Sequence, residues 1–94
     1  MARDLVWWGR MRGVLFDVRW PDGTLTTFYA PSAIIGMILE ADRSYAIDEL
    51  VTRSRAALGA ASERAAAALA DLLPRAHAFG MQDRARIERL RPAD

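Results

Sequence analysis

The sequence predicts an α+β domain in which an antiparallel β-hairpin packs against one long helix and one or two shorter helices. Residues 14–30 hold two runs of β-branched and aromatic residues on either side of a Pro-Asp-Gly turn. Residues 47–72 repeat apolar side chains at helical spacing. The chain has only 94 residues, so we interpret residues 1–94 as one small domain with a thin core.

The hairpin is formed by the runs Val14–Trp20 and Thr24–Ala30. Pro21 presets φ at the first corner of the turn, and Gly23 takes the left-handed position that makes a bulge. This turn fixes the register of the two strands, which pairs Trp20 with Thr24, Val18 with Thr26, Phe16 with Phe28, and Val14 with Ala30.

Alternation along the two strands divides their side chains between a buried face and an exposed face. The buried face is predicted to carry Val14, Phe16, Val18, Trp20 and Phe28. The other face carries Asp17, Arg19 and Thr27, together with Leu15, Leu25 and Tyr29. A lone hairpin is marginally stable in water, so we expect a third strand, supplied by Leu5–Trp8 or by a second copy of the chain.

The hairpin is followed by a short apolar segment. Pro31 and Ser32 end the second strand, and residues 33–39 form either a short helix or a buried extended segment. Residues 40–45 are predicted to be a polar connection.

The long helix is predicted over residues 47–72. Ser44 or Ala46 lies at its N-terminal edge, and Asp48 and Glu49 in the first turn favour its dipole. Its apolar stripe consists of Leu50, Val51, Ser54, Ala57, Leu58, Ala61, Ala65, Ala68, Leu69 and Leu72. The central alanines allow close approach of another backbone.

Pro74 is predicted to end or kink the long helix. A short final helix over residues 75–90, with a break near Gly80, places Phe79, Ile87 and Leu90 against the core. Residues 91–94 are a tail. Residues 1–12 are an N-terminal extension, and Met11 is an alternative to Met1 as the start.

Composition excludes several kinds of chemistry. The chain has no cysteine and one histidine, which excludes disulfides, thiolate metal sites and a multi-histidine metal site within one chain. We predict neither a metal nor a cofactor. The net charge is +1, which gives little steering toward nucleic acid or a membrane surface. No apolar run approaches the length of a membrane span and no secretory signal is present, so a cytoplasmic location is predicted.

No assembled catalytic set is visible in the sequence. His77 is best explained by a surface or capping role, and Ser54 has neither a base nor an oxyanion hole nearby in the sequence. Arginines interleave with Trp7, Trp8 and Trp20, a pattern that can bind single-stranded nucleic acid, but nearby aspartates oppose it. The adjacent Trp7 and Trp8 are more typical of a packed edge or a protein interface.

An ordered series of short motifs carries a family resemblance. Phe16-Asp17-Val18-Arg19-Trp20-Pro21-Asp22-Gly23 is followed by Phe28-Tyr29-Ala30-Pro31-Ser32, then by Tyr45, Ser54-Arg55-Ala56-Ala57-Leu58, Ala61-Ser62-Glu63-Arg64 and Gln82-Asp83-Arg84-Ala85-Arg86-Ile87-Glu88. Over about residues 14 to 90 the chain resembles the small nitrogen-starvation response proteins encoded in bacterial nitrilase gene clusters. It diverges from them at Ala30, where the family has serine, and in the alanines after Arg64.

The resemblance implies a context rather than a reaction. The gene clusters of this family encode a nitrilase and further enzymes, which implies a pathway for nitrogen-containing small molecules. No catalytic residues carry over. Trp20 and Tyr29 pack, residues 21–23 turn the chain, and Arg55 or Glu63 holds the helix to the hairpin by an ion pair.

Three functions remain open. The leading hypothesis is a non-enzymatic accessory protein that binds an enzyme of the same gene cluster. The alternative is a small enzyme or metabolite-binding subunit whose site is completed between chains. A nucleic-acid-binding regulator comes third. The candidate contact residues for a partner or ligand are Trp7, Trp8, Arg19, Tyr29, Ser32, Arg55 and Glu63.

The hairpin also predicts self-association. The strand Thr24–Ala30 carries no charge, and an uncharged edge strand pairs readily with another strand. The alanines at positions 57, 61, 65 and 68 offer a second surface for a copy of the helix. We therefore predict a homodimer, and the alternative is a monomer in which Leu5–Trp8 covers the edge.

Overall fold

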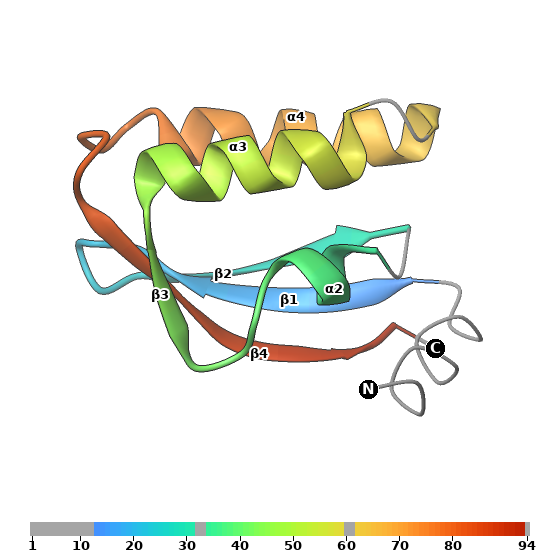
Figure 1. Ribbon diagram of the computed structural model, residues 1–94, viewed down its shortest axis with the longest axis horizontal. Coiled ribbons are helices and arrows are strands. Elements are labelled where there is room, and N and C mark those ends of the chain that lie inside the picture. Colours follow the sequence, from blue (N-terminus) through green and yellow to red (C-terminus); the bar gives the residue numbers. More distant parts are fainter. Residues whose placement is uncertain (1–12, 32–33, 60–61, 94) are drawn as a thin grey trace.

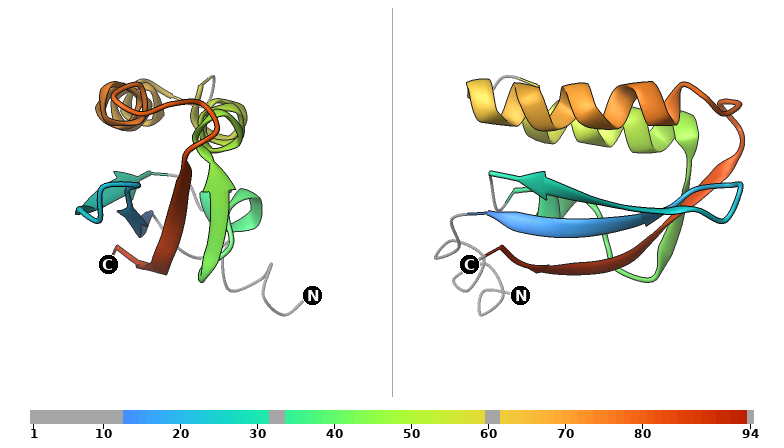
Figure 2. Two further views of the ribbon diagram at one scale, coloured as in Figure 1. Left: turned by 90° about the vertical axis from the view of Figure 1, so that its left-hand side faces the viewer. Right: turned by 180° about the vertical axis from the view of Figure 1, so that it is seen from behind.

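The protein is a four-stranded antiparallel sheet with two long helices over one face (Figure 1). The computed structural model describes residues 13–31, 34–59 and 62–93. In chain order the elements are β1 (Val14–Arg19), β2 (Leu25–Ala30), α2 (Ile35–Ile38), β3 (Arg43–Ala46), α3 (Ile47–Leu58), α4 (Glu63–Ala76) and β4 (Arg84–Pro92). The strand order is β2-β1-β4-β3. Helices α3 and α4 lie side by side over one face of the sheet (Figure 2).

The α+β class and the hairpin are confirmed. Strand β1 pairs with β2 in the predicted register, with Phe16 opposite Phe28 and Val18 opposite Thr26. The turn is closed by the Trp20 N–H, which donates to the Thr24 carbonyl at 2.8 Å. Gly23 has φ of 88°, a conformation that costs glycine little and other residues more.

The predicted core face is also confirmed. Every member of that face is buried, as are the predicted helix residues that pack above it: Val14, Phe16, Val18, Trp20, Phe28, Leu50, Leu58 and Leu69. Phe16 stacks on Phe28 with ring centroids 5.4 Å apart. On the opposite face of the hairpin, which was predicted to be exposed, Asp17 is buried, with only 7% of its surface exposed.

The single long helix predicted over residues 47–72 is wrong. The chain forms two helices, α3 and α4, which run antiparallel to each other (Figure 1). Ser62 begins α4 as its N-cap, because its Oγ accepts a hydrogen bond from the Ala65 N–H at 3.1 Å. Helix α4 then continues through Pro74 and ends at Ala76.

The break between the helices changes the role of the alanine stripe. Ala57, Ala65 and Ala68 are buried within the chain, where α3 contacts α4 and α4 contacts β2. Small side chains let these layers approach closely. The described alanines of the stripe therefore serve packing within one chain, and Ala61 lies outside the described residues.

The final helix predicted over residues 75–90 is also wrong, because residues 84–92 form β4. This strand pairs with β1 on one side and β3 on the other, so it supplies the third strand of the sheet. The predicted tail is partly in this strand, with Arg91 opposite Leu15 and Pro92 opposite Val14. The predicted core contacts do hold: Ile87 is buried, and Phe79 and Leu90 pack against the core.

The fourth strand lies in the predicted polar connection, where β3 occupies residues 43–46. Within residues 33–39, where a helix or an extended segment was expected, Ile35–Ile38 form α2, a helix of one turn. It lies on the β3 side of the sheet (Figure 2), where Arg53 of α3 donates to the Ile38 carbonyl at 2.9 Å. The candidate strand Leu5–Trp8 and the rest of the extension 1–12 lie outside the described residues.

Ser54 gives a first testable prediction, because its side chain is fully buried on α3 and its hydroxyl has no hydrogen-bond partner. An unpartnered buried polar group costs about 1–3 kcal/mol, and alanine has the higher helix propensity. Ser54→Ala is therefore expected to raise the free energy of unfolding by about 1 kcal/mol, measured by urea denaturation.

The matched control is the same substitution at the N-cap of α4. Ser62→Ala removes the bond to the Ala65 N–H, so it should lower the free energy of unfolding by about 1 kcal/mol. A lower denaturation midpoint for Ser54→Ala would show that the Ser54 hydroxyl stabilises the fold.

Candidate functional site

The candidate site is the outer face, by which we mean the face of the sheet opposite α3 and α4. No described helix covers this face (Figure 2). The strand registers assign its side chains, because residues directly opposite each other in paired strands point to the same side. The outer face carries Leu15, Asp17 and Arg19 of β1, Leu25, Thr27 and Tyr29 of β2, and Arg84, Arg86, Glu88, Arg89 and Arg91 of β4.

A β-bulge in β4 explains how so many arginines reach one face. Asp17 pairs with Arg89, whereas the next residue of β1, Val18, pairs with Ile87. Glu88 is therefore the extra residue, and it shifts the alternation of β4 by one position. As a result the arginines before and after the bulge share the outer face, while Ala85, Ile87 and Leu90 contribute to the core.

Asp17 is the most buried charge on the outer face. Its Oδ1 accepts a hydrogen bond from the Thr27 hydroxyl at 2.7 Å and lies 3.3 Å from Nη2 of Arg91. The Thr27 hydrogen bond lowers the pKa of the Asp17 carboxyl from its usual value, and the charges of Arg91 and Arg89 act in the same direction against the opposing effect of burial.

The depressed pKa of Asp17 predicts a loss of stability in acid. A carboxyl whose folded pKa is below its unfolded value, about 3.9, contributes stability above that pH and loses it as the pH falls through the folded pKa. The gap in unfolding free energy between the wild type and Asp17→Asn should therefore be constant near neutral pH and shrink below about pH 4.

The same measurement has an internal check in Thr27→Val. This variant removes the hydroxyl that contributes most to the depressed pKa, so its stability should fall at a higher pH than that of the wild type. If the difference in unfolding free energy between the wild type and Asp17→Asn stays unchanged down to pH 2, the pKa of Asp17 is not the cause of the acid sensitivity.

A second charge network lies beside the turn. Glu88 is 3.6 Å from Arg19 and 3.5 Å from Arg86, measured between the carboxylate oxygens and the guanidinium nitrogens. Arg86 also reaches Asp42 at 2.9 Å. Each carboxylate of the face thus already has an arginine partner.

The outer face nevertheless keeps unused positive charge. Among the described residues Arg89 is exposed and forms no ion pair, and Nε of Arg91 is buried without a hydrogen-bond partner. Arginine presents a planar fork of donors that matches a carboxylate or phosphate. The arrangement can therefore bind an anionic group on an incoming molecule.

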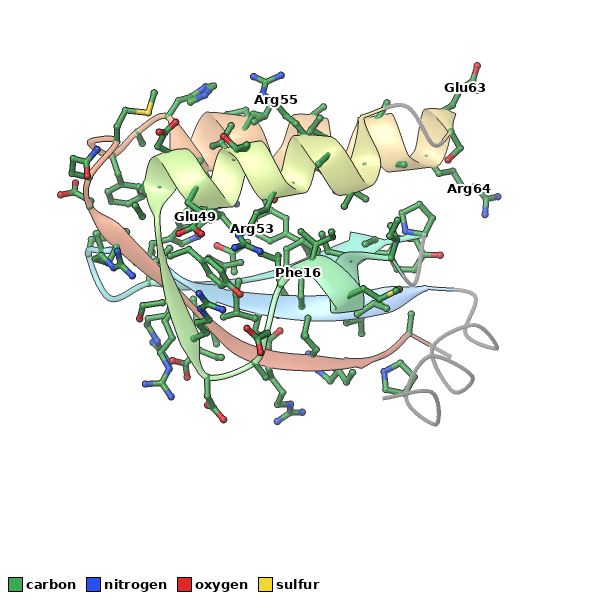
Figure 3. The ribbon with its side chains drawn as sticks, viewed as in Figure 1. Phe16, Glu49, Arg53, Arg55, Glu63 and Arg64 are labelled. Atoms are coloured by element: carbon green, nitrogen blue, oxygen red, sulfur yellow. The ribbon has the colours of Figure 1, made fainter. Side chains whose placement is uncertain are left out.

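The predicted contact residues divide between two sides of the molecule. Arg19 and Tyr29 share the outer face. Arg55 and Glu63 are exposed on the helices, where Arg55 points away from the sheet and Glu63 lies at the start of α4 (Figure 3). Neither forms an ion pair within the described residues, so the predicted helix-to-hairpin ion pair is not formed. Trp7, Trp8 and Ser32 lie outside the described residues.

Sequence reasoning missed the arginines of β4, which form most of the face. A signal was present: residues 84–87 alternate polar and apolar, Glu88 adds one extra polar residue, and residues 89–91 resume the alternation one position later. Period-two alternation indicates a half-buried strand, and a single shift in phase indicates a bulge. Ile87 and Leu90 lie three residues apart, which is also compatible with the helix predicted over residues 75–90.

Other kinds of site have less support in the described part of the chain. It contains no group of three metal-ligating side chains. His77 is exposed, and Ser54 is fully buried without a hydrogen-bond partner, so the Ser54 hydroxyl is out of reach of a substrate. None of the helices in residues 13–31, 34–59 and 62–93 is long and apolar enough to cross a membrane.

Comparison with known proteins supplies the family. No curated protein and no solved structure matches the chain. A protein family described as nitrogen starvation-induced protein NitG matches residues 15–89, which extend from β1 to β4 and include nearly the whole outer face. This confirms the resemblance carried by the motifs from Phe16 to Glu88, and the chain therefore belongs to the nitrogen starvation-induced NitG family.

Proposed function

We propose that this protein is a non-enzymatic accessory protein that binds an acidic segment of a partner protein through its outer face. The observation that carries the proposal is the set of arginines that β4 places on a sheet face with no described helix over it. Surfaces that bind proteins are enriched in arginine and aromatic residues, and this face holds Arg89 without an ion pair and a half-exposed Tyr29.

The charge pattern favours a protein partner over nucleic acid. The carboxylates of Asp17 and Glu88 alternate with the guanidinium groups of the face. A continuous phosphate backbone would lie over those carboxylates and be repelled by them, whereas an acidic segment with interspersed polar residues need not. Tyr29 is the only aromatic side chain that β1, β2 and β4 place on this face, and single-strand binding usually needs several stacking rings.

The partner we propose is an enzyme encoded in the same gene cluster. The family resemblance implies this context, since its members are encoded beside a nitrilase and other enzymes. An accessory protein needs a surface of its own for its partner, and the outer face provides one.

The test is a binding measurement with a matched pair of charge reversals. The purified protein is titrated with each enzyme of the gene cluster in turn, and Arg89→Glu is compared with Arg55→Glu. Both arginines are exposed and free of ion pairs among the described residues, but only Arg89 lies on the outer face. We expect Arg89→Glu to weaken binding by about tenfold or more and Arg55→Glu to leave it unchanged.

Three outcomes would overturn the proposal. The first is equal binding by the two variants. The second is turnover or tight binding of a small nitrogenous metabolite by the protein alone, which favours the enzyme or metabolite-binding alternative. The third is binding of single-stranded nucleic acid that falls steeply with salt, which favours the regulator.

A further inference from the structure

We propose that two copies of the chain pair through their β2 strands, antiparallel about a two-fold axis at Thr27. This surface takes Tyr29 from the outer face but leaves the arginines of β4 uncovered, so the inference goes beyond the proposed function. Strand β2 forms one edge of the sheet, and it contains no charged residue in Leu25–Ala30. Uncharged edge strands of this length are templates for a further strand.

The two edges of the sheet differ in how far they are protected. Strand β3 has only four residues, and α2 lies on its side of the sheet (Figure 2). Arg84 donates to the carbonyl of Ser44 at 2.9 Å, and the guanidinium group of Arg43 lies 5.2 Å from the centre of the Tyr45 ring. A short strand with arginine side chains over it is a poor template for pairing, so a second copy adds at β2.

The register identifies the backbone groups that β2 offers. Trp20 and Thr24 are a hydrogen-bonded pair, and hydrogen-bonded pairs recur every second residue in an antiparallel ladder. Thr26, Phe28 and Ala30 therefore direct their N–H and C=O groups toward β1. The intervening residues direct theirs away from the sheet; these are Leu25, Thr27 and Tyr29.

The outward-facing groups are self-complementary about Thr27. An antiparallel copy centred there pairs Thr27 with its own counterpart and Leu25 with Tyr29 of the second copy. The side chains of Leu25 and Tyr29 are 47% and 44% exposed, and each would cover the other across the new strand pair. Aliphatic–aromatic pairs of this kind stabilise antiparallel sheets. The exposed apolar side chains of β2 would therefore be covered by those on β2 of the second copy.

The helix layer is compatible with the same axis. Strands lie about 4.8 Å apart, so two strands span about 9.6 Å, which agrees with the 8–10 Å between packed helices. One chain has four strands under two long helices, so a second copy continues both layers at the same spacing. The groove between β2 and α4 is lined on the helix side by small side chains, among them Ala67 and Ala70, and by the charged side chains of Arg64, Asp71 and Arg75. The approach of two α4 helices therefore requires Asp71 to face an arginine of the other copy.

The first test measures mass in solution for a matched pair of variants. Light scattering at tens of micromolar should give the mass of two chains for the wild type and for Thr52→Lys, whose site is exposed on α3. Thr27→Lys should give the mass of one chain, because like charges directly opposite each other destabilise a strand pair. Thr26 is left unchanged, since its Oγ1 accepts a hydrogen bond from Trp20 Nε1 at 3.0 Å. Thr27→Lys removes the hydroxyl that donates to Asp17, so its mass is compared only after circular dichroism shows that the variant is folded.

A cross-linking test separates loss of pairing from loss of folding. The chain has no cysteine, so a single new thiol reports on its own surroundings. Residues paired at the axis have Cα atoms about 5.5 Å apart, within the range of a disulfide. Under mild oxidation Thr27→Cys should form a covalent dimer and Thr52→Cys should stay a monomer. A wild-type mass of one chain, a two-chain mass for Thr27→Lys, or equal cross-linking of both cysteine variants would overturn the proposal.

Discussion

Phe16→Ala is expected to lower the free energy of unfolding by about 3–5 kcal/mol, a large share of the roughly 5–15 kcal/mol that stabilises a small domain. Phe16 is 1% exposed at the centre of the sheet, below the helices (Figure 3), and its ring stacks on Phe28. Removing the ring leaves a cavity between the sheet and the helix layer. Urea denaturation followed by circular dichroism measures the loss.

The control for Phe16→Ala is a truncation at an exposed position. Met81 is 53% exposed, so Met81→Ala should change the free energy of unfolding by less than about 0.5 kcal/mol. Equal effects of the two substitutions would contradict the placement of Phe16 at the centre of the core.

Trp20→Ala is expected to cost a similar amount, about 3–5 kcal/mol, for a different reason. Trp20 ends the first strand of the hairpin and is 3% exposed. Its ring stacks on Phe79 at 5.7 Å between centroids and meets Phe28 edge-on at 6.2 Å. Phe79 follows α4, so Trp20 joins the hairpin to the segment that leads into β4.

A graded pair of variants separates the ring contacts of Trp20 from its hydrogen bond. Trp20→Phe keeps an aromatic ring against Phe79 but loses the Nε1 bond to Thr26, so it should cost less than Trp20→Ala. Thr26→Val removes the same bond and keeps the ring. If Trp20→Phe were as destabilising as Trp20→Ala, ring stacking would not be the main contribution.

The hairpin was predictable because local rules determine it. A Pro-Asp-Gly turn fixes which residues are paired, and alternation then fixes which side chains are buried. No distant contact was needed to place Phe16 opposite Phe28. For the same reason Arg19 and Tyr29 were correctly placed outside the buried face of the hairpin.

The rest of the sheet depended on contacts that local patterns do not determine. The stripe from Val51 to Leu72 keeps helical spacing across the break, because α3 and α4 both bury apolar residues on the sheet side. Ser62 caps α4 and marks the break, but the periodicity of the apolar residues does not reveal it. Strand β4 pairs with β1 from the far end of the described chain, and neither periodicity nor propensity specifies such a distant partner.

Part of the candidate site could be predicted from the sequence, namely the part that belongs to the hairpin. Arg19 belongs to the hairpin, so its face followed from the register. Arg89 and Arg91 belong to β4, and their place beside Asp17 depends on the pairing of β4 with β1, which short-range spacing does not specify.

The strand order also constrains when the protein can fold during its synthesis. The two central strands, β1 and β4, come from the first and last parts of the described chain, so contacts between distant residues dominate the sheet. Such topologies form slowly, because a long loop must close before the pairing stabilises it. On the ribosome the hairpin exists for some time without β4, with an open edge on both strands. A nascent chain of this protein is therefore exposed to aggregation until the arginine-rich strand has emerged, and that strand completes both the sheet and the outer face.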